Sequence, residues 1–209
     1  IREFSYEKLF LELYNEPTTD MDIWKLTATT LVRELRKEDP DRIFIIGGAN
    51  YNGINELLTM GKLPSDDGKI LYTFHFYEPY VFTHQGADWT KEKTYMTGLP
   101  YPFKKRRMPE LIGAAPDSEV IKEFERFPRE SNYDYLFMRI KKIKAEADKQ
   151  NLPLICTETG VINLASTKAK SAFLRDITTI MKRFEIPVML WDYNDKFGIL
   201  KGEKVIKQL

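Results

Sequence analysis

Two glutamates in this chain stand where an apolar run gives way to a turn. Glu16 lies between Asn15 and Pro17, and Glu158 lies two residues before Gly160. A pair of carboxylates at two strand ends can hydrolyse a glycosidic bond, because one can exchange a proton while the other attacks the sugar. Alone, each motif is weak, since an acidic residue at a strand end or before a helix is ordinary.

Two further runs end in residues that suit a sugar site. His75 and Tyr77 are two residues apart, so both are expected on one face of a strand. Trp191 ends another run, and an indole there offers a flat apolar face that can stack on a sugar ring. Each also has an ordinary structural interpretation, because a strand histidine is often a satisfied core residue and tryptophan is highly buried on average.

The composition narrows the class of function. The chain has 209 residues with 32 Lys+Arg against 31 Asp+Glu, a net charge of +1 that argues against nucleic-acid binding as the main role. The basic cluster at 104–107 is expected to be a solvated loop. No apolar stretch reaches the length of a membrane span. The single Cys156 excludes an internal disulfide and is expected to be a small buried hydrophobe.

No metal or cofactor is expected from the sequence. Neither glutamate has a neighbour pattern typical of metal ligands, and 2 histidines cannot supply a histidine-rich site. The pair Gly47-Gly48 lacks the spacing of a dinucleotide-binding fingerprint.

The hydrophobic pattern predicts strands that alternate with helices. The β-like runs are Leu9–Asn15, Arg42–Gly47, Ile70–Phe76, Leu152–Thr157 and Pro187–Asp192. Helical periodicity covers Trp24–Leu35, Ile54–Met60, Leu136–Ala147 and Phe173–Phe184, the last with Ser166 or Thr167 as its N-cap. This alternation indicates βαβ units, a parallel sheet and the α/β class.

The spacing of the strand ends suggests a barrel. Consecutive ends are 32, 29, 81 and 35 residues apart, and a (β/α)8 barrel allots roughly 31 residues to each unit. The long interval contains an aromatic, proline-rich stretch, Pro79–Pro128, and a loop of that length is usually functional. Its aromatic residues are equally suited to stacking on a glycan chain or to packing the loop: Tyr80, Phe82, Trp89, Tyr95, Tyr101 and Phe103.

Taken together, these motifs resemble glycoside hydrolase family 5, the cellulase family whose acid/base lies on strand 4 and whose nucleophile lies on strand 7. The resemblance rests on Asn-Glu-Pro, His-x-Tyr, Thr-Glu-x-Gly and the last-strand tryptophan, in that order. The stretches Tyr72–Trp89 and Gly98–Pro102 also look like bacterial members. The nucleophile motif departs at Thr159, where many members carry phenylalanine.

The resemblance implies a role for each candidate residue. Glu16 would be the acid/base and Glu158 the nucleophile of a retaining double displacement. Asn15 would bind the 2-hydroxyl of the sugar. Support for the nucleophile would come from His75 and Tyr77, and Trp191 would be the floor of the subsite that holds the reacting sugar.

The resemblance also implies an incomplete barrel. Residues 1–209 would be the C-terminal part of a catalytic domain, supplying roughly strands 4 to 8 with a long loop after strand 6. Open sheet edges would favour self-association or completion by a missing N-terminal segment. The expected partner is a β-1,4-glucan or a related plant polysaccharide, met in a secreted or periplasmic location. The alternative is a catalytically incompetent fragment that binds carbohydrate or depends on assembly.

Overall fold

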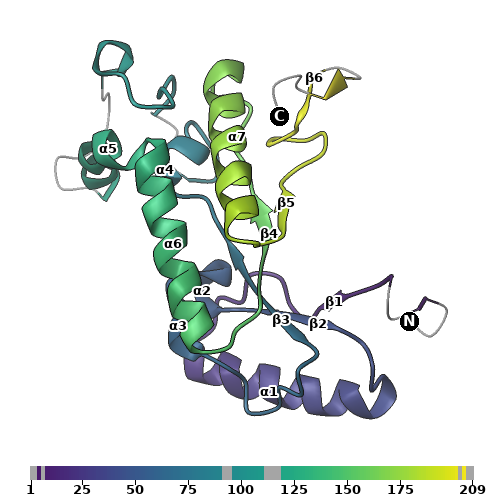
Figure 1. The fold of residues 1–209 in the computed structure, drawn as a ribbon. Coiled ribbons are helices and arrows are strands. Elements are labelled where there is room, and N and C mark those ends of the chain that lie inside the picture. Colours follow the sequence, from purple (N-terminus) through teal and green to yellow (C-terminus); the bar gives the residue numbers. More distant parts are fainter. Residues whose placement is uncertain (1–3, 6–7, 91–95, 111–118, 202–203, 206–209) are drawn as a thin grey trace. The chain divides into compact units, whose positions relative to one another are not determined.

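The computed structural model describes residues 4–5, 8–90, 96–110, 119–201 and 204–205. It divides into two compact units, which are treated separately below (Figure 1). Unit 1 comprises Ile1–Phe76 and Lys142–Thr157, and unit 2 comprises Tyr77–Lys141 and Glu158–Leu209. No helix in the described part of the chain is long and apolar enough to cross a membrane.

Unit 1 is built on strands that follow one another across a sheet. The order is β1 (Leu11–Glu12), β2 (Phe44–Gly47), β3 (Ile70–His75) and the first residues of β4 (Leu154–Thr159). The strand β2 pairs in parallel with both β1 and β3. Every residue of β2 is buried, whereas both residues of β1 are only partly buried. The core of this unit therefore lies around β2 and β3, and β1 is an edge.

The long helix α1 (Met21–Glu38) begins where the sequence provides a cap. The Asp20 carboxylate accepts hydrogen bonds from the backbone N–H groups of Asp22 and Ile23, which satisfies two donors of the first turn. One face of the helix is buried, and its Trp24 indole donates a hydrogen bond of 2.8 Å to the carbonyl of Gly47 at the end of β2. Figure 1 shows α1 running beside the strands of this unit.

A buried arginine anchors the segment that leads into β1. Arg42 is only 2% exposed, and its guanidinium pairs with the Asp39 carboxylate at 2.8 Å. It also donates hydrogen bonds to the carbonyls of Phe4, Ser5 and Leu9. Because a planar guanidinium presents five donors in fixed directions, one side chain can hold three backbone oxygens of this segment at once.

Unit 2 contains most of the remaining helices and strands of the described residues. Its elements are α4 (Tyr80–Thr83), η2 (Lys105–Arg107), α5 (Glu119–Glu130), α7 (Thr167–Arg183), β5 (Val188–Leu190) and the hairpin β6–β7 (Leu200–Lys201 and Lys204–Val205). The helix α6 (Tyr133–Lys149) begins in unit 2 and ends in unit 1. In unit 1, α2 (Ala49–Asn52) and α3 (Ile54–Met60) connect β2 to β3.

The predicted elements exist, but several boundaries differ. The helix α3 spans the predicted Ile54–Met60, and Ser166 is the N-cap of α7, with its hydroxyl accepting from the Ala169 N–H. The first strand is much shorter than Leu9–Asn15, because only Leu11 and Glu12 pair with β2. The prediction for Cys156 is confirmed, since it is fully buried, and residues 104–107 are exposed as expected.

Lys170 is the most unusual buried residue of α7. It is 2% exposed, and its ammonium donates to Asn163 Oδ1 at 2.6 Å and to the carbonyls of Phe197 and Gly198, both at 2.8 Å. Burial lowers the pKa of Lys170 to about 8, with the Asp192 carboxylate opposing the shift. The three acceptors take all three of its N–H donors, so this side chain ties the segment after β5 to α7.

Replacement of Lys170 by methionine is expected to destabilise the protein, because three acceptors lose their donor. Buried unsatisfied acceptors make the expected loss about 2–4 kcal/mol in the free energy of unfolding. Thermal and urea unfolding measure it. The control is Lys168→Met on the same helix, where the side chain is exposed and a change within about 0.5 kcal/mol is expected. Equal effects of the two substitutions would contradict the role assigned to Lys170.

Candidate active site

In unit 1 the first candidate glutamate stands on a strained turn. Glu16 follows β1 and has a φ of 51°, a left-handed conformation that is uncommon for a residue with a side chain. The carbonyl of Pro17 accepts a hydrogen bond from the Tyr51 N–H at 3.3 Å, which ties this turn to the segment after β2. The preceding Asn15 is exposed, and its amide has no hydrogen-bond partner within the described residues. It therefore remains available to a ligand.

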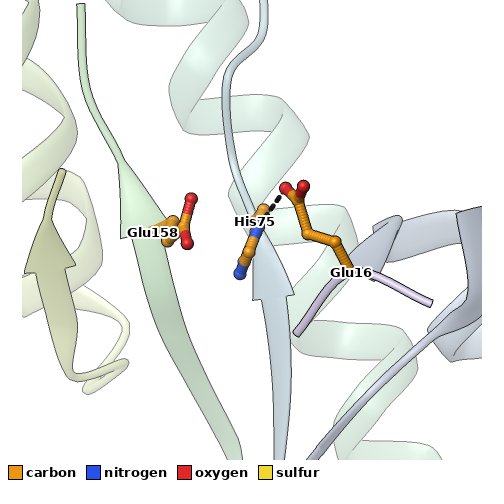
Figure 2. A group of neighbouring side chains, drawn as sticks. All are labelled: Glu16, His75 and Glu158. Atoms are coloured by element: carbon orange, nitrogen blue, oxygen red, sulfur yellow. Dashed lines mark hydrogen bonds and ion pairs between the residues drawn. The ribbon is translucent and has the colours of Figure 1, made fainter. Parts of the chain in front are cut away.

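His75 is the hydrogen-bond partner of Glu16. Its Nδ1 lies 2.7 Å from Glu16 Oε1, and Figure 2 shows the carboxylate directed at the imidazole ring. The imidazole is 3% exposed while the Glu16 side chain is 33% exposed. This contact was not foreseen from the sequence, which had assigned His75 to the support of Glu158.

The other ring nitrogen of His75 meets a residue that sequence reasoning missed. Asn52 Nδ2 lies 3.1 Å from His75 Nε2 and donates a second hydrogen bond, also 3.1 Å, to Glu12 Oε1. Asn52 is fully buried. The one sequence signal was the run Gly-Gly-Ala-Asn-Tyr-Asn-Gly from residue 47 to residue 53, because glycine and asparagine tolerate left-handed turns.

In unit 2 the second candidate glutamate has its own donor. The Tyr77 hydroxyl donates a hydrogen bond of 2.9 Å to Glu158 Oε2. The Tyr77 ring packs against a small buried cluster of Ala87, Ile162 and Phe197. Its carbonyl accepts from the Thr83 hydroxyl at 2.6 Å, so both the ring and the backbone of Tyr77 are held in place. Tyr77 and Glu158 are thus hydrogen-bonded, and the roles that the sequence assigns to them stay predictions.

Trp191 lies beside the backbone that follows Glu158. Its backbone N–H donates to the Thr159 carbonyl at 2.8 Å, and the Trp191–Asp192 peptide bond is cis. A Cβ at Gly160 would lie 2.0 Å from the Trp191 carbonyl oxygen, so no larger residue fits there. The indole is 49% exposed, which leaves it free to contact a ligand and argues against the core-tryptophan interpretation.

A third carboxylate, that of Glu78 in unit 2, forms an ion pair with Arg139. The Glu78 carboxylate accepts hydrogen bonds of 2.9 Å from Nε and from one terminal nitrogen of Arg139. The Tyr135 hydroxyl donates to the same carboxylate at 3.4 Å. Burial and the Glu78 charge raise the pKa of Tyr135 to about 12. This bidentate pairing with Arg139 and the contact with Tyr135 hold the Glu78 carboxylate in place.

The aromatic residues of the long loop divide into two groups. Phe82 and Tyr101 are buried at 0% and 4% exposure, so they pack the loop. Tyr80 and Trp89 are 38% and 48% exposed and present ring surface to solvent. Trp89 and Lys196 line a cavity of about 310 Å³. Phe103 is partly buried, and Tyr95 lies outside the described residues.

Comparison with known proteins identifies relatives of the whole stretch. The sequence model described as Cellulase (glycosyl hydrolase family 5) matches residues 4–197. Endoglucanase 3 of Fibrobacter succinogenes is 30% identical over 216 residues, covering 97% of this chain and 32% of that protein. Endoglucanase C of Acetivibrio thermocellus is 29% identical over 189 residues, covering 90% of this chain and 54% of that protein. The chain thus spans about half or less of the length of these relatives.

The fold has solved counterparts as well. The cellulose synthase subunit Z of Clostridioides difficile superimposes with a TM-score of 0.78 at 21% identity, covering 99% of this chain and 61% of that one. At this identity the likeness concerns the fold alone, and it confirms the expected α/β class of the (β/α)8 type. Because the family model matches nearly the full length, the chain belongs to the cellulase family, glycosyl hydrolase family 5.

Proposed function

We propose that this chain carries the catalytic residues of a retaining glycoside hydrolase that cleaves β-1,4-glucan or a related plant polysaccharide. Family membership and the two endoglucanase relatives support the reaction class and the glucan. The observation that carries the proposal is the hydrogen bond from the Tyr77 hydroxyl to Glu158. It orients one carboxylate oxygen of the proposed nucleophile.

The proposed reaction runs in two displacements. Glu158 attacks the anomeric carbon and forms a glycosyl ester while Glu16 gives its proton to the departing glycosidic oxygen. Glu16, now a carboxylate, takes a proton from water, and the oxygen of that water displaces Glu158 from the sugar. This sequence requires the two carboxyl groups to lie about 5–5.5 Å apart, a separation that stays a prediction.

The other candidate residues bind the sugar. Asn15 is exposed beside Glu16, and its amide can hydrogen-bond the 2-hydroxyl of the reacting sugar. Trp191 offers a half-exposed indole as the floor of that subsite. We propose that residues 1–209 form the C-terminal part of the catalytic domain. A secreted or periplasmic location suits an insoluble polymer that cannot cross a membrane.

Retention predicts the anomer that forms first. Two successive displacements at one carbon restore its configuration, so β-linked oligosaccharides should release the β-anomer before mutarotation equilibrates the product. Time-resolved proton NMR of the anomeric signals measures this directly. Initial release of the α-anomer would contradict double displacement and would indicate direct attack by water.

Substitution of Glu158 and of its donor should have graded effects. Glu158→Gln keeps the shape but removes the nucleophile, so hydrolysis of soluble β-glucan should fall below detection. Tyr77→Phe removes one hydrogen bond to a charged group, worth about 1.5–3 kcal/mol, so kcat/KM should fall about 10- to 100-fold. Initial rates measure both effects, and circular dichroism checks the fold. Undiminished hydrolysis by Glu158→Gln would refute the assignment of the nucleophile.

A second candidate function is favoured by the partly exposed edge of unit 1. The strand β1 is flanked by Phe10 and Tyr14, which are 40% and 59% exposed. In unit 2, Met189 on β5 is 51% exposed. Unpaired strand edges with exposed apolar residues invite another strand. On this alternative, the chain is an assembly-dependent or carbohydrate-binding fragment without activity of its own.

Mass and activity measured together separate the two candidates. We expect light scattering to give a mass larger than that of one chain, because the apolar edge of β1 can be covered by a second copy. Hydrolysis of β-glucan is then assayed on the same fractions. A stable monomer that hydrolyses β-glucan would contradict the fragment interpretation, whereas an inactive protein that still binds β-glucan would support it.

A further inference from the structure

Four polar side chains in unit 1 form a continuous hydrogen-bonded chain that ends on the proposed acid/base. Asn52 Nδ2 contacts Glu12 Oε1 and His75 Nε2, each at 3.1 Å. His75 Nδ1 in turn contacts Glu16 Oε1 at 2.7 Å (Figure 2). The two central members are buried, with Asn52 at 0% and His75 at 8% exposure. These contacts are called the Glu12–Glu16 relay below.

The chemistry of the relay determines the protonation of its histidine. Glu12 presents an oxygen acceptor, so the Asn52 amide must turn its nitrogen, and not its oxygen, toward Glu12. The same nitrogen faces His75 Nε2, which therefore has to accept. A neutral imidazole carries one proton, so that proton lies on Nδ1 and is donated to Glu16.

The backbone around Asn52 is costly for the protein to maintain. Asn50, Tyr51 and Asn52 have φ values of 53°, 61° and 53°, three left-handed residues in a row. This conformation is unfavourable for a residue with a side chain, and less so for asparagine. A Cβ at Gly47 would lie 2.0 Å from Asn52 Oδ1, so the glycine makes the space for this amide. Strain of this kind persists where the surroundings enforce it and clusters at functional sites.

The amide also leaves one buried atom unsatisfied. Asn52 Oδ1 has no hydrogen-bond partner among the described residues, and a buried acceptor without a partner is destabilising. An apolar residue at this position would avoid this penalty, although it would tolerate the left-handed backbone less well than asparagine does. The contacts of the Asn52 amide nitrogen with Glu12 and His75 therefore explain this residue better than the filling of space in the core does.

We propose that Asn52, oriented by Glu12, is a positioning residue that holds His75 in its Nδ1–H tautomer so that this N–H aims the Glu16 carboxyl group. The inference rests on the proposed role of Glu16 as acid/base. With the other tautomer, the Nδ1 lone pair would face the carboxylate and push it out of line.

Leaving-group dependence tests this role. Acid catalysis matters most when the departing oxygen is a poor leaving group, and it contributes about 10²–10⁴-fold. Asn52→Ala should therefore lower kcat/KM by about 10- to 100-fold on a cello-oligosaccharide. On a dinitrophenyl β-cellobioside, whose leaving group needs no proton, we expect a loss of less than about 3-fold. Asn52→Asp, which tolerates the same backbone, should show the same contrast.

The matched control is Asn50→Ala. Asn50 has the same φ of 53°, but its amide is exposed and bonds Glu56 at 3.1 Å, away from the relay. The control should lose similar stability in thermal unfolding and keep kcat/KM on both substrates. Equal losses on both substrates for Asn52→Ala, or equal behaviour of the Asn50 and Asn52 variants, would overturn the inference.

A readout independent of activity uses the small number of histidines. The chain has 2, His75 and His84, so ¹⁵N-labelled imidazole spectra can be assigned by comparison with His84→Gln. The protein without substrate should show a protonated Nδ1 and an unprotonated Nε2 for His75, and Asn52→Ala should lose this preference. A protonated Nε2 in the unsubstituted protein would refute the relay. Absence of hydrolysis by that protein would instead refute the proposed function and leave the tautomer result standing.

Discussion

A carboxylate that loses water at the end of a strand has to accept hydrogen bonds from the protein, because an unpaired buried charge is severely destabilising. Glu12, Glu16, Glu78 and Glu158 are all partly buried, and each meets this condition within its own unit. Much of the surrounding architecture serves to deliver the donors. The indole of Trp24 fixes the end of β2, from which the turn to Asn52 starts. The packing of α1 on β2 therefore helps to place a side chain that hydrogen-bonds a carboxylate.

The three strand-end carboxylates Glu16, Glu78 and Glu158 differ in the kind of side chain that pairs with them. Arg139 gives Glu78 a permanently charged partner in a bidentate ion pair. Glu158 instead accepts a hydrogen bond from the Tyr77 hydroxyl, and Glu16 pairs with the His75 imidazole. From sequence alone Glu78 is a strand-end carboxylate like the other two. Only its partner distinguishes it.

The sequence predicted best those features that depend on local pattern. Hydrophobic periodicity located α3 at its observed bounds, and hydroxyl-bearing residues before α7 identified the region of the Ser166 cap. Alternation along the third strand and the motif order identified Tyr77 and Glu158, whose hydrogen bond matches the expected pairing. The partner of His75 could not be read in the same way. It depends on the approach of a turn 59 residues earlier in the chain, which no local pattern encodes.

Asn52 is a second residue whose contacts no local sequence pattern predicts. Its importance follows from three left-handed residues, from the missing Cβ of Gly47 and from acceptors 40 residues before and 23 residues after it. In the sequence, the only trace is a run of glycine and asparagine, which equally describes an ordinary loop. Ordinary loops use such residues because they turn the chain at little cost. Here the turn is strained and carries the buried Asn52 side chain, so the position of that side chain explains the turn better than the change in chain direction does.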